Sequence, residues 1–531
     1  MTHSTSRIAI ALLLSLAACG TADADPSSSA GEDVPLPRRD ENAPPSTPAA
    51  PSAPPPPPPV VGEPEDAELT EAIGVFVAAG AAANGEGTRA NPVSTISGGL
   101  ARAKAEGKRV YVCTGTYKEA VVLANEIPVI GGFDCTGHRW KRVGERSRIE
   151  SPTSPALRAK DITSPTRFDG VDVVAPDAYG ASASSIAFVA ENASGLQMVK
   201  SKLTAGAAGD GADGTEGAQL MLGAMTGGDG RDAATLRFDT GLEVVAYRKG
   251  GDGSTGSCVG GPGHDGESGG DGGSGGTYVC TTIKKTQPGG FVLEFLGWDW
   301  YRNFSGSPYV RTEGEARSGD PGTAGADGVS AKGIGAFTAD GYVPSNGSAG
   351  THGTSGKGGR GGSGQASRQG QTCTNRGQIW YAADGAGGGA GGCPGLAGTA
   401  GTGGGASVAA LVFSSPGLTF DACELVAGNG GRGGRGTLGS LPTPGAAPGT
   451  KYGEAEAAMS GGAGGRAGAS GSGAGGPSIA LVHSGAAPKM LNGSTTKAGV
   501  GGAGVPQQSR PGYAVSVPAS AAGIAKEVHA L

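Results

Sequence analysis

Three stretches of the chain, beginning at Ser185, Ser407 and Ser478, share one pattern. Each opens with a small apolar run, Ser-Ile-Ala or Ser-Val-Ala, and each places the glycine of an Ala-Gly pair 21 residues after the serine. Self-similarity with a period of about 20 to 30 residues is typical of a solenoid, in which each repeat buries its apolar side by stacking on a neighbour. The alternative is that these short motifs recur by chance in a chain with 105 glycines.

Apolar residues also recur at matching offsets inside the repeats, and they are spaced by two as in β-strands. They are Leu196 and Leu418; Met198, Phe420 and Leu491; and Leu203 and Leu425. The pattern predicts an all-β solenoid of short strands. In this solenoid the later copies stack on the earlier coils, and a large insertion loops out between them.

The segment 74–140 is the least repetitive part of the chain. It predicts a strand at 74–77, a short helix at 95–106 and a strand at 109–113. The residues at 87–92, Gly-Thr-Arg-Ala-Asn-Pro, and at 110–117, Val-Tyr-Val-Cys-Thr-Gly-Thr-Tyr, resemble the N-terminal cap and first coils of pectin-lyase-like proteins. This resemblance extends to about Gly206 and returns from Ala406. It implies a right-handed parallel β-helix whose end is covered by the helix.

Glycine recurs at every third residue in several tracts between these regions. The tracts run over 260–275, 319–328, 347–362 and 392–404. Collagen has this period, but the tracts are brief, separately phased and poor in proline. They resemble instead the polyglycine-II bundles of some antifreeze proteins and phage tail adhesins. A disordered glycine-rich linker is the alternative.

The N-terminus predicts export and lipid anchoring. Arg7 precedes an apolar run at 8–16 that is too short to span a bilayer, and Leu16-Ala17-Ala18-Cys19 resembles the lipobox of bacterial lipoproteins. The resemblance implies that residues 1–18 are removed and that Cys19 carries acyl chains, palmitate among them, which bind the membrane. Gly20 favours the outer membrane. An ordinary secretory signal is the alternative.

Composition sets the remaining boundaries. Residues 19–66 are rich in proline, with an unbroken run at 54–59, and predict a disordered tether. We expect the cap and first coils at 67–205, a glycine-rich insertion with small aromatic islands at 206–405, and C-terminal coils at 406–531. A net charge of -6 gives no reason to expect nucleic acid as a partner.

Seven further cysteines in an exported chain indicate disulfides. Neighbours in sequence pair plausibly as Cys113 with Cys135, Cys258 with Cys280, and Cys373 with Cys393. Cys423 is left over, and Ser201 and Ser494 occupy its offset in the other repeats. We expect it to fill a small-residue position in the stack.

The pectin-lyase-like family includes polysaccharide lyases and hydrolases, so an enzyme of that class is the alternative function. The family's Asn-Thr-Asp, Asp-Asp and Gly-His-Gly signatures are missing from the sequence, which favours a role without catalysis. We expect no cofactor. Several Asp-Gly pairs could hold calcium loosely, but turns and solvated edges are the favoured interpretation of these pairs.

Trp298, Trp300 and Tyr301 are the candidates for ligand binding. Aromatic side chains beside polar groups stack well on sugars and on protein partners. A small local core beneath the insertion is the favoured interpretation of this cluster, and ligand binding is the alternative. The sequence therefore predicts a surface lipoprotein with a structural, adhesive or ligand-binding role, whose ligand is a glycan or a protein.

Overall fold

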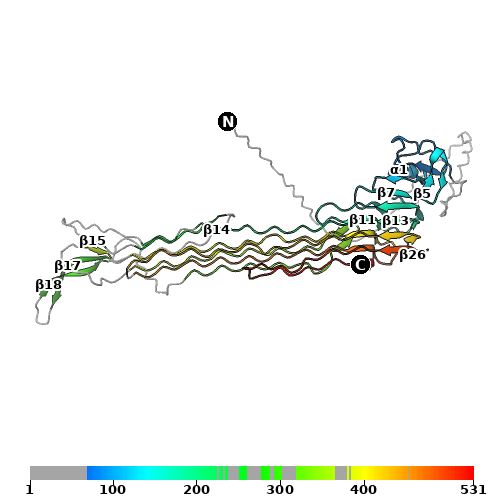
Figure 1. The fold of residues 1–531 in the computed structure, drawn as a ribbon. Helices are drawn as coiled ribbons and strands as arrows, with labels where there is room; N and C mark the ends of the chain where they lie inside the picture. The colour runs from blue at the N-terminus through cyan, green and yellow to red at the C-terminus, as the bar shows by residue number, and fades with distance from the viewer. Residues whose placement is uncertain are drawn as a thin grey trace, which may run out of the picture. The chain divides into compact units, whose positions relative to one another are not determined.

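The computed structural model describes residues 69–223, 226–230, 250–259, 318–364, 384–453 and 455–531, and the backbone of four strands between residues 234 and 381. Contacts divide the chain into Met1–Pro58 and Pro59–Leu531. Figure 1 shows the elements of the second unit. The predicted signal, the predicted tether at 19–66 and Cys19 lie outside the described residues.

Three parallel sheets contain most of the strands. The first consists of β1 (Gly74–Val77), β2 (Arg109–Cys113), β5 (Val129–Asp134), β9 (Thr166–Asp169), β12 (Leu196–Val199), β23 (Thr419–Asp421) and β26 (Lys489–Leu491), with β6 (Lys141–Arg142) antiparallel on β5. The second consists of β3 (Thr116–Tyr117), β7 (Ser147–Glu150), β10 (Val171–Val174), β13 (Lys202–Thr204), β24 (Glu424–Val426) and β27 (Thr495–Lys497). The third consists of β4 (Val121–Val122), β8 (Leu157–Lys160), β11 (Ser185–Glu191), β22 (Ser407–Phe413), β25 (Ser478–Ser484) and β28 (Ala525–Ala530).

Smaller antiparallel pairings account for the other strands. β14 (Met221–Leu222) pairs with β16 (Cys258–Val259), and β19 (Ala336–Thr338) pairs with β20 (Gly341–Val343). A four-stranded sheet has the order β15 (Ala234–Leu236), β21 (Ile379–Tyr381), β17 (Thr277–Thr286), β18 (Val292–Tyr301). In the described residues α1 (Ile96–Glu106) is the one α-helix, and a 3-10 turn covers Thr136–His138. The predicted all-β class is therefore confirmed.

From β7 onward the chain visits the three parallel sheets in turn. β7, β8 and β9 enter the second, third and first sheets, and β10, β11 and β12 repeat the cycle one strand further along each sheet. β22, β23 and β24 continue the third, first and second sheets directly beside β11, β12 and β13. The order of the sheets is therefore kept across the long insertion.

The three sequence repeats lie side by side, as predicted. Ser185 pairs with Ser407 and Ser407 with Ser478 in the parallel register of the third sheet. All three serines are buried. The Ser478 hydroxyl accepts the N–H of Gly499 at 2.8 Å and donates to the carbonyl of Gly428, the matching glycine of the repeat before, at 2.6 Å. One buried hydroxyl thus joins two neighbouring repeats, which explains the spacing of 21 residues.

Apolar side chains form the core between the sheets. Phe168, Met198, Phe420 and Met490 share one register row of the first sheet, and the first three are fully buried. The prediction for Leu491 is wrong, because Met490 takes the position beside Phe420 and Leu491 is 41% exposed. A slip of one residue along a strand moves a side chain to the other face.

Helix α1 covers the first strands, in agreement with the predicted cap. Thr95 is its N-cap residue and accepts the N–H of Gly98, while the helix ends at Gly107 in the left-handed conformation. Ile96 and Leu100 are buried in the same cluster as Val77 and other core residues of the first sheet.

The glycine-rich segments run beside one another and are joined by backbone hydrogen bonds at every third residue. The N–H groups of Gly319, Gly322, Gly325 and Gly328 donate to the carbonyls of Ser460, Ala463, Arg466 and Ala469 at 2.6–3.0 Å. On another side of the same segment, Thr351 and Thr354 donate to Ala326 and Thr323 at 2.9 and 3.0 Å, in the antiparallel sense. The three-residue period of the sequence is thus the period of the hydrogen bonds. The tract at 260–275 lies outside the described residues.

Close backbone approach explains why glycine occupies the bonded positions. A Cβ atom added at Gly464 would lie 1.9 Å from the carbonyl oxygen of Cys393, and one added at Gly434 would lie 1.9 Å from that of Ala212. These contacts are with backbone of a neighbouring segment, which a small rotation of a side chain cannot relieve. Glycine at such positions therefore permits the observed distance between segments.

We predict that Gly464→Ala destabilises the protein by about 1 to 3 kcal/mol, because the added methyl group forces two hydrogen-bonded segments apart. Urea unfolding followed by circular dichroism measures the change. Gly333→Ala is the matched control, because a Cβ there meets nothing within 4 Å. Equal unfolding midpoints for the two variants would contradict this account of the packing.

Candidate functional sites

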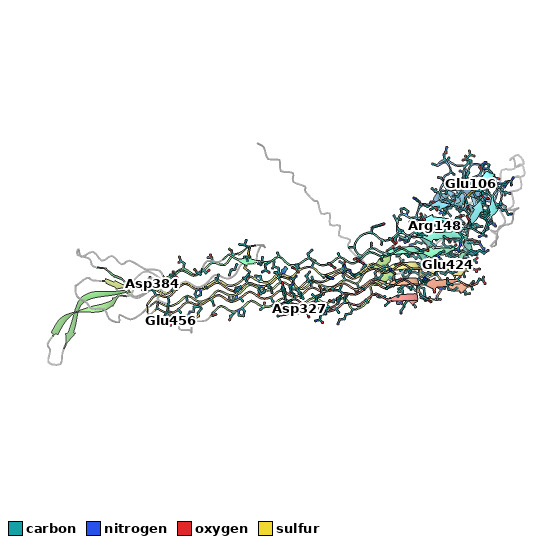
Figure 2. All side chains as sticks on the ribbon, viewed as in Figure 1. Glu106, Arg148, Asp327, Asp384, Glu424 and Glu456 are labelled. Atoms are coloured by element: carbon teal, nitrogen blue, oxygen red, sulfur yellow. A yellow bond between two sulfur atoms is a disulfide. The ribbon has the colours of Figure 1, made fainter. Side chains whose placement is uncertain are left out.

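The second parallel sheet carries a row of charged residues with alternating sign. Arg148, Asp172, Lys202 and Glu424 occupy successive register positions on β7, β10, β13 and β24. Glu424 lies 3.1 Å from the Lys202 ammonium and 3.6 Å from the Arg146 guanidinium, which also lies 2.9 Å from Asp172. Figure 2 labels Arg148 and Glu424 at the two ends of this row. Because this row places two carboxylates on one sheet, it is the place to test for the catalytic carboxylate pair of a lyase or hydrolase.

The chemistry of this row favours structure over catalysis. The side-chain hydrogen bond from Lys202 lowers the pKa of Glu424, whereas a general acid at neutral pH needs a raised pKa. Asp172 is engaged by Arg146 and by the backbone N–H of Lys202 at 2.9 Å. Cross-strand pairs of opposite charge stabilise neighbouring strands. We interpret the row as a set of ion pairs that hold consecutive coils in register.

Aspartates of the Asp-Gly pairs bind backbone of neighbouring segments. Asp213 accepts the N–H of Arg435 at 2.8 Å, Asp229 that of Thr450 at 2.7 Å, and Asp327, labelled in Figure 2, that of Ala469 at 2.9 Å. In the part of the chain that the structure describes, no group of three or more His, Cys, Asp or Glu residues could hold a metal ion. These carboxylates have a structural use, and loosely held calcium stays a prediction.

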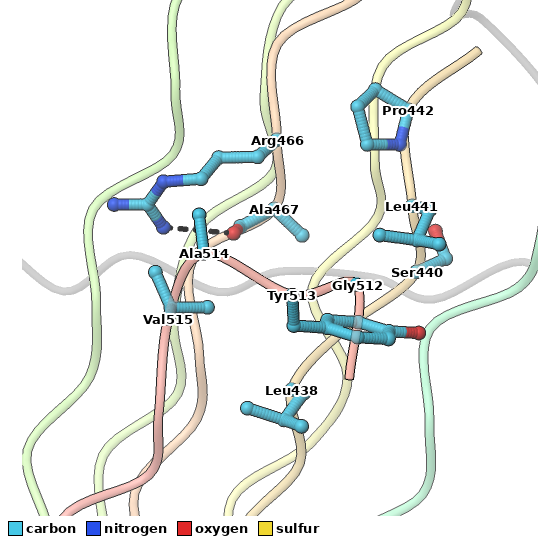
Figure 3. Close-up of a pocket in the computed structure, with 10 residues that line it drawn as sticks. All are labelled: Leu438, Ser440, Leu441, Pro442, Arg466, Ala467, Gly512, Tyr513, Ala514 and Val515. Atoms are coloured by element: carbon cyan, nitrogen blue, oxygen red, sulfur yellow. Dashed lines mark hydrogen bonds between the residues drawn. The ribbon is translucent and has the colours of Figure 1, made fainter. Parts of the chain in front are cut away.

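A pocket of about 310 Å³ lies between residues 438–442, residues 466–467 and the loop at 512–515 (Figure 3). Its lining is mostly apolar, with Leu441 and Tyr513 prominent. The polar side chains around it already bond within the protein: Ser440 accepts the N–H of Leu396 at 2.8 Å, and Arg466 donates to Asp327 and to the carbonyl of Ala467. Such a lining offers no acid or base to a bound molecule.

The disulfides agree with the prediction at one pair and differ at another. Cys113 is bonded to Cys135, with Cα atoms 5.9 Å apart. Cys113 ends β2, and Cys135 directly follows β5, the neighbouring strand of the first sheet. Cys258 is bonded to Cys393, with Cα atoms 5.8 Å apart. The predicted pairs of Cys258 with Cys280 and of Cys373 with Cys393 are therefore wrong. Cys280 lies in β17, and Cys373 lies outside the described residues.

The glycine-rich register explains the pairing of Cys258. Gly251 donates its N–H to Gly385, and Ser254 donates to Gly388, both at 2.9 Å, so these two segments run parallel. Continuing this register brings Cys258 beside Cys393. Segments far apart in sequence thus become neighbours in space, and pairing by proximity in sequence fails.

Cys423 fills a buried position, as predicted. Its thiol donates to the carbonyls of Met198 and Asp421, and its N–H donates to the hydroxyl of Ser494, the matching residue of the next repeat. Burial raises the pKa of the thiol to about 11, so it stays protonated at neutral pH. This residue contributes packing rather than a reactive thiolate.

The three candidate binding residues lie at the end of β18. Trp300 is the register partner of Tyr278, and Trp298 is the partner of Cys280. Tyr301 follows Trp300 directly, so strand alternation places it on the opposite face of the sheet. β21 adds Trp380 opposite Tyr278, a neighbour that sequence analysis missed. The sequence shows the aromatic pair Trp380-Tyr381, but it does not show that Trp380 pairs with Tyr278.

Comparison with protein-family models, with curated proteins and with solved structures finds no match to this chain. Among the described residues, no helix is long and apolar enough to cross a membrane.

We predict that acid weakens the contacts between glycine-rich segments. The N–H of Arg435 is the main cause that lowers the pKa of Asp213 below its ordinary value of 3.8. The unfolded chain therefore takes up the proton first, and the stabilisation is complete above about pH 5 and lost as the pH falls through the lowered pKa. Asp213→Asn keeps an oxygen for the N–H of Arg435 but removes the charge.

The measurement is the urea unfolding free energy of wild type and Asp213→Asn at about pH 6 and about pH 3. Wild type should be the more stable at the higher pH, by at most about 1 kcal/mol, and the gap should close in acid. Asp340→Asn, in the exposed turn between β19 and β20, controls for the loss of one charge. A gap that is independent of pH would contradict the assignment.

Proposed function

We propose that this chain is an outer-membrane lipoprotein whose folded part displays a ligand-binding surface and has no catalytic role. In this proposal residues 1–18 are a signal that is removed, Cys19 carries the acyl chains, and the proline-rich residues 19–66 tether the folded part to the membrane. The support is the apolar run after Arg7 and the four residues that end at Cys19.

The proposed architecture is a right-handed parallel β-helix with polyglycine-II segments. Successive strands enter three parallel sheets in a fixed cycle, as the coils of a β-helix do. Parallel crossover connections are right-handed in nearly all proteins, which supports the hand. The hydrogen bonds at every third glycine support the polyglycine-II geometry.

The insertion at 206–405 carries the functional proposal. β11 precedes the insertion and β22 follows it, and the two strands pair in parallel register. The insertion therefore does not interrupt the stacking of the sheets. Hydrogen bonds join its segments from Gly405 and Gly209, next to these strands, to Gly230, which lies close in sequence to β15. Gly230 itself donates its N–H to Thr450, in a segment that follows the insertion. The β15, β21, β17, β18 sheet, which contains three of the four tryptophans of the chain, belongs to this insertion. We infer that the bonded segments hold this sheet for recognition.

The charged row of the second sheet supports a role without catalysis, because its carboxylates are neutralised by basic neighbours. The buried Cys423 thiol, with its raised pKa, gives no nucleophile. Binding of a glycan or a protein by aromatic residues requires neither a free carboxylate nor a nucleophilic thiol.

Glycan-array binding of the full chain tests the proposal. We expect binding to at least one class of glycan, and loss of that binding by at least about tenfold in Trp298→Ala/Trp300→Ala, since aromatic contacts dominate such sites. Tyr179→Ala is the matched control, because this tyrosine is 90% exposed and lies outside the insertion. Binding to no glycan would contradict a glycan ligand, and shortening of a bound polysaccharide would contradict the non-catalytic role.

A further inference from the structure

The three parallel sheets all end in the last coil of the stack. β26, β27 and β28 are the last strands of the first, second and third sheets, and among the described residues each pairs with a strand on one side alone. Their outward N–H and C=O groups therefore form an open row to which a further strand can add. The other end of the stack differs, because helix α1 packs on β1 and because β3 and β4 are only two residues long.

Each of these last strands carries a lysine at a register position that is uncharged in the coil before. The register pairs are Lys489 with Thr419, Lys497 with Val426, and Lys526 with Ile479. We call Lys489, Lys497 and Lys526 the edge lysines. All three are exposed. Lysine on an edge strand opposes the addition of another strand, because pairing would take the ammonium group out of water.

The edge lysines also differ from lysines on inner strands in having no acidic partner. Lys202 on β13 lies 3.1 Å from Glu424, and Lys160 on β8 lies 3.0 Å from Glu191. Within the described part of the chain, no carboxylate forms an ion pair with any of the edge lysines. Their charge is therefore not cancelled locally, and it acts on any molecule that approaches this end of the stack.

A second copy of this chain would meet the same charges on its own last coil. Leu491 is 41% exposed and Val528 is 45% exposed, so apolar side chains accompany the open backbone row and favour association. The three strands carry three lysines and one glutamate, Glu527, so the last coil has an excess of positive charge. Like charges that face one another across an interface oppose association.

We propose that the edge lysines keep the open end of the stacked sheets from pairing with the same end of a second copy. The end covered by α1 offers no free strand of comparable length, so it gives the last coil no edge to pair with. Each copy is thus kept separate by charge at one end and by a helix at the other. This inference does not depend on the proposed ligand-binding role.

Sedimentation velocity of the full chain tests the inference, in a Cys19→Ser background so that acyl chains play no part in association. The neutral variant, Lys489→Thr/Lys497→Val/Lys526→Ile, gives each edge strand the residue of the coil before it. We expect it to self-associate at least about tenfold more tightly than the parent chain, which should be monomeric.

The matched control, Lys118→Thr/Lys332→Val/Lys451→Ile, makes the same three changes at exposed lysines that lie outside the strands. It should stay monomeric, because its open end keeps the edge lysines. Equal association of the control and the neutral variant would overturn the inference, since loss of charge at any place would then suffice.

Charge reversal provides a second measurement that does not depend on the neutral variant. Lys489→Glu/Lys497→Glu/Lys526→Glu should be monomeric alone, because its last coils repel one another with the opposite sign. Mixed with the parent chain it should form a 1:1 complex, which about 1 M salt should dissociate by screening the charges.

Association of the neutral variant or formation of the 1:1 complex, with a monomeric control, would support the inference. If the neutral variant stays monomeric and the mixture forms no complex, the edge lysines do not keep copies apart and the inference is wrong. A parent chain that self-associates as tightly as the neutral variant would contradict it equally. None of these results bears on glycan binding, so the proposed function stands or fails separately.

Discussion

Backbone hydrogen bonds between segments are the interaction on which this structure depends. A chain with 105 glycines and 5% aromatic residues has little apolar surface to bury, yet its N–H and C=O groups still require partners wherever water is excluded. In the parallel sheets these partners come from the strand before and after. In the glycine-rich segments they come from several surrounding segments at once, one bond for every third residue. The absence of a side chain at the bonded positions is what lets the backbones approach.

Side-chain oxygens complete this network where the backbone alone does not. Ser478 connects glycines of two repeats, and Asp213 and Asp327 accept N–H groups of neighbouring segments. Patterns that look like turn signals or weak calcium ligands in sequence are therefore used to bind backbone.

The sequence predicted what depends on local periodicity. The strand at 74–77, the helix that begins after Thr95 and the stacking of the Ser185, Ser407 and Ser478 repeats follow from spacing alone, and the structure has them. Features that depend on pairing between remote segments were missed. The Cys258 to Cys393 disulfide follows from the register of two glycine-rich segments, and the row of Trp300, Tyr278 and Trp380 follows from strand pairing. Leu491 was misplaced because one residue of slip inverts the faces of a strand.

Amide hydrogen exchange of the glycine-rich segments, read by mass spectrometry, tests the central claim most directly. If the segments at 318–331 and 345–362 are held by the observed hydrogen bonds, their peptides should take up deuterium far more slowly than an unstructured chain of the same composition. In 318–331 about one amide in three should be protected by a backbone hydrogen bond, chiefly at the glycine positions. In 345–362 the amides of Ser348, Thr351, Thr354 and Lys357 should be protected as well as those of the bonded glycines. Amides bonded to side-chain oxygens add to both sets. Complete exchange of both segments at the earliest time point would contradict the account.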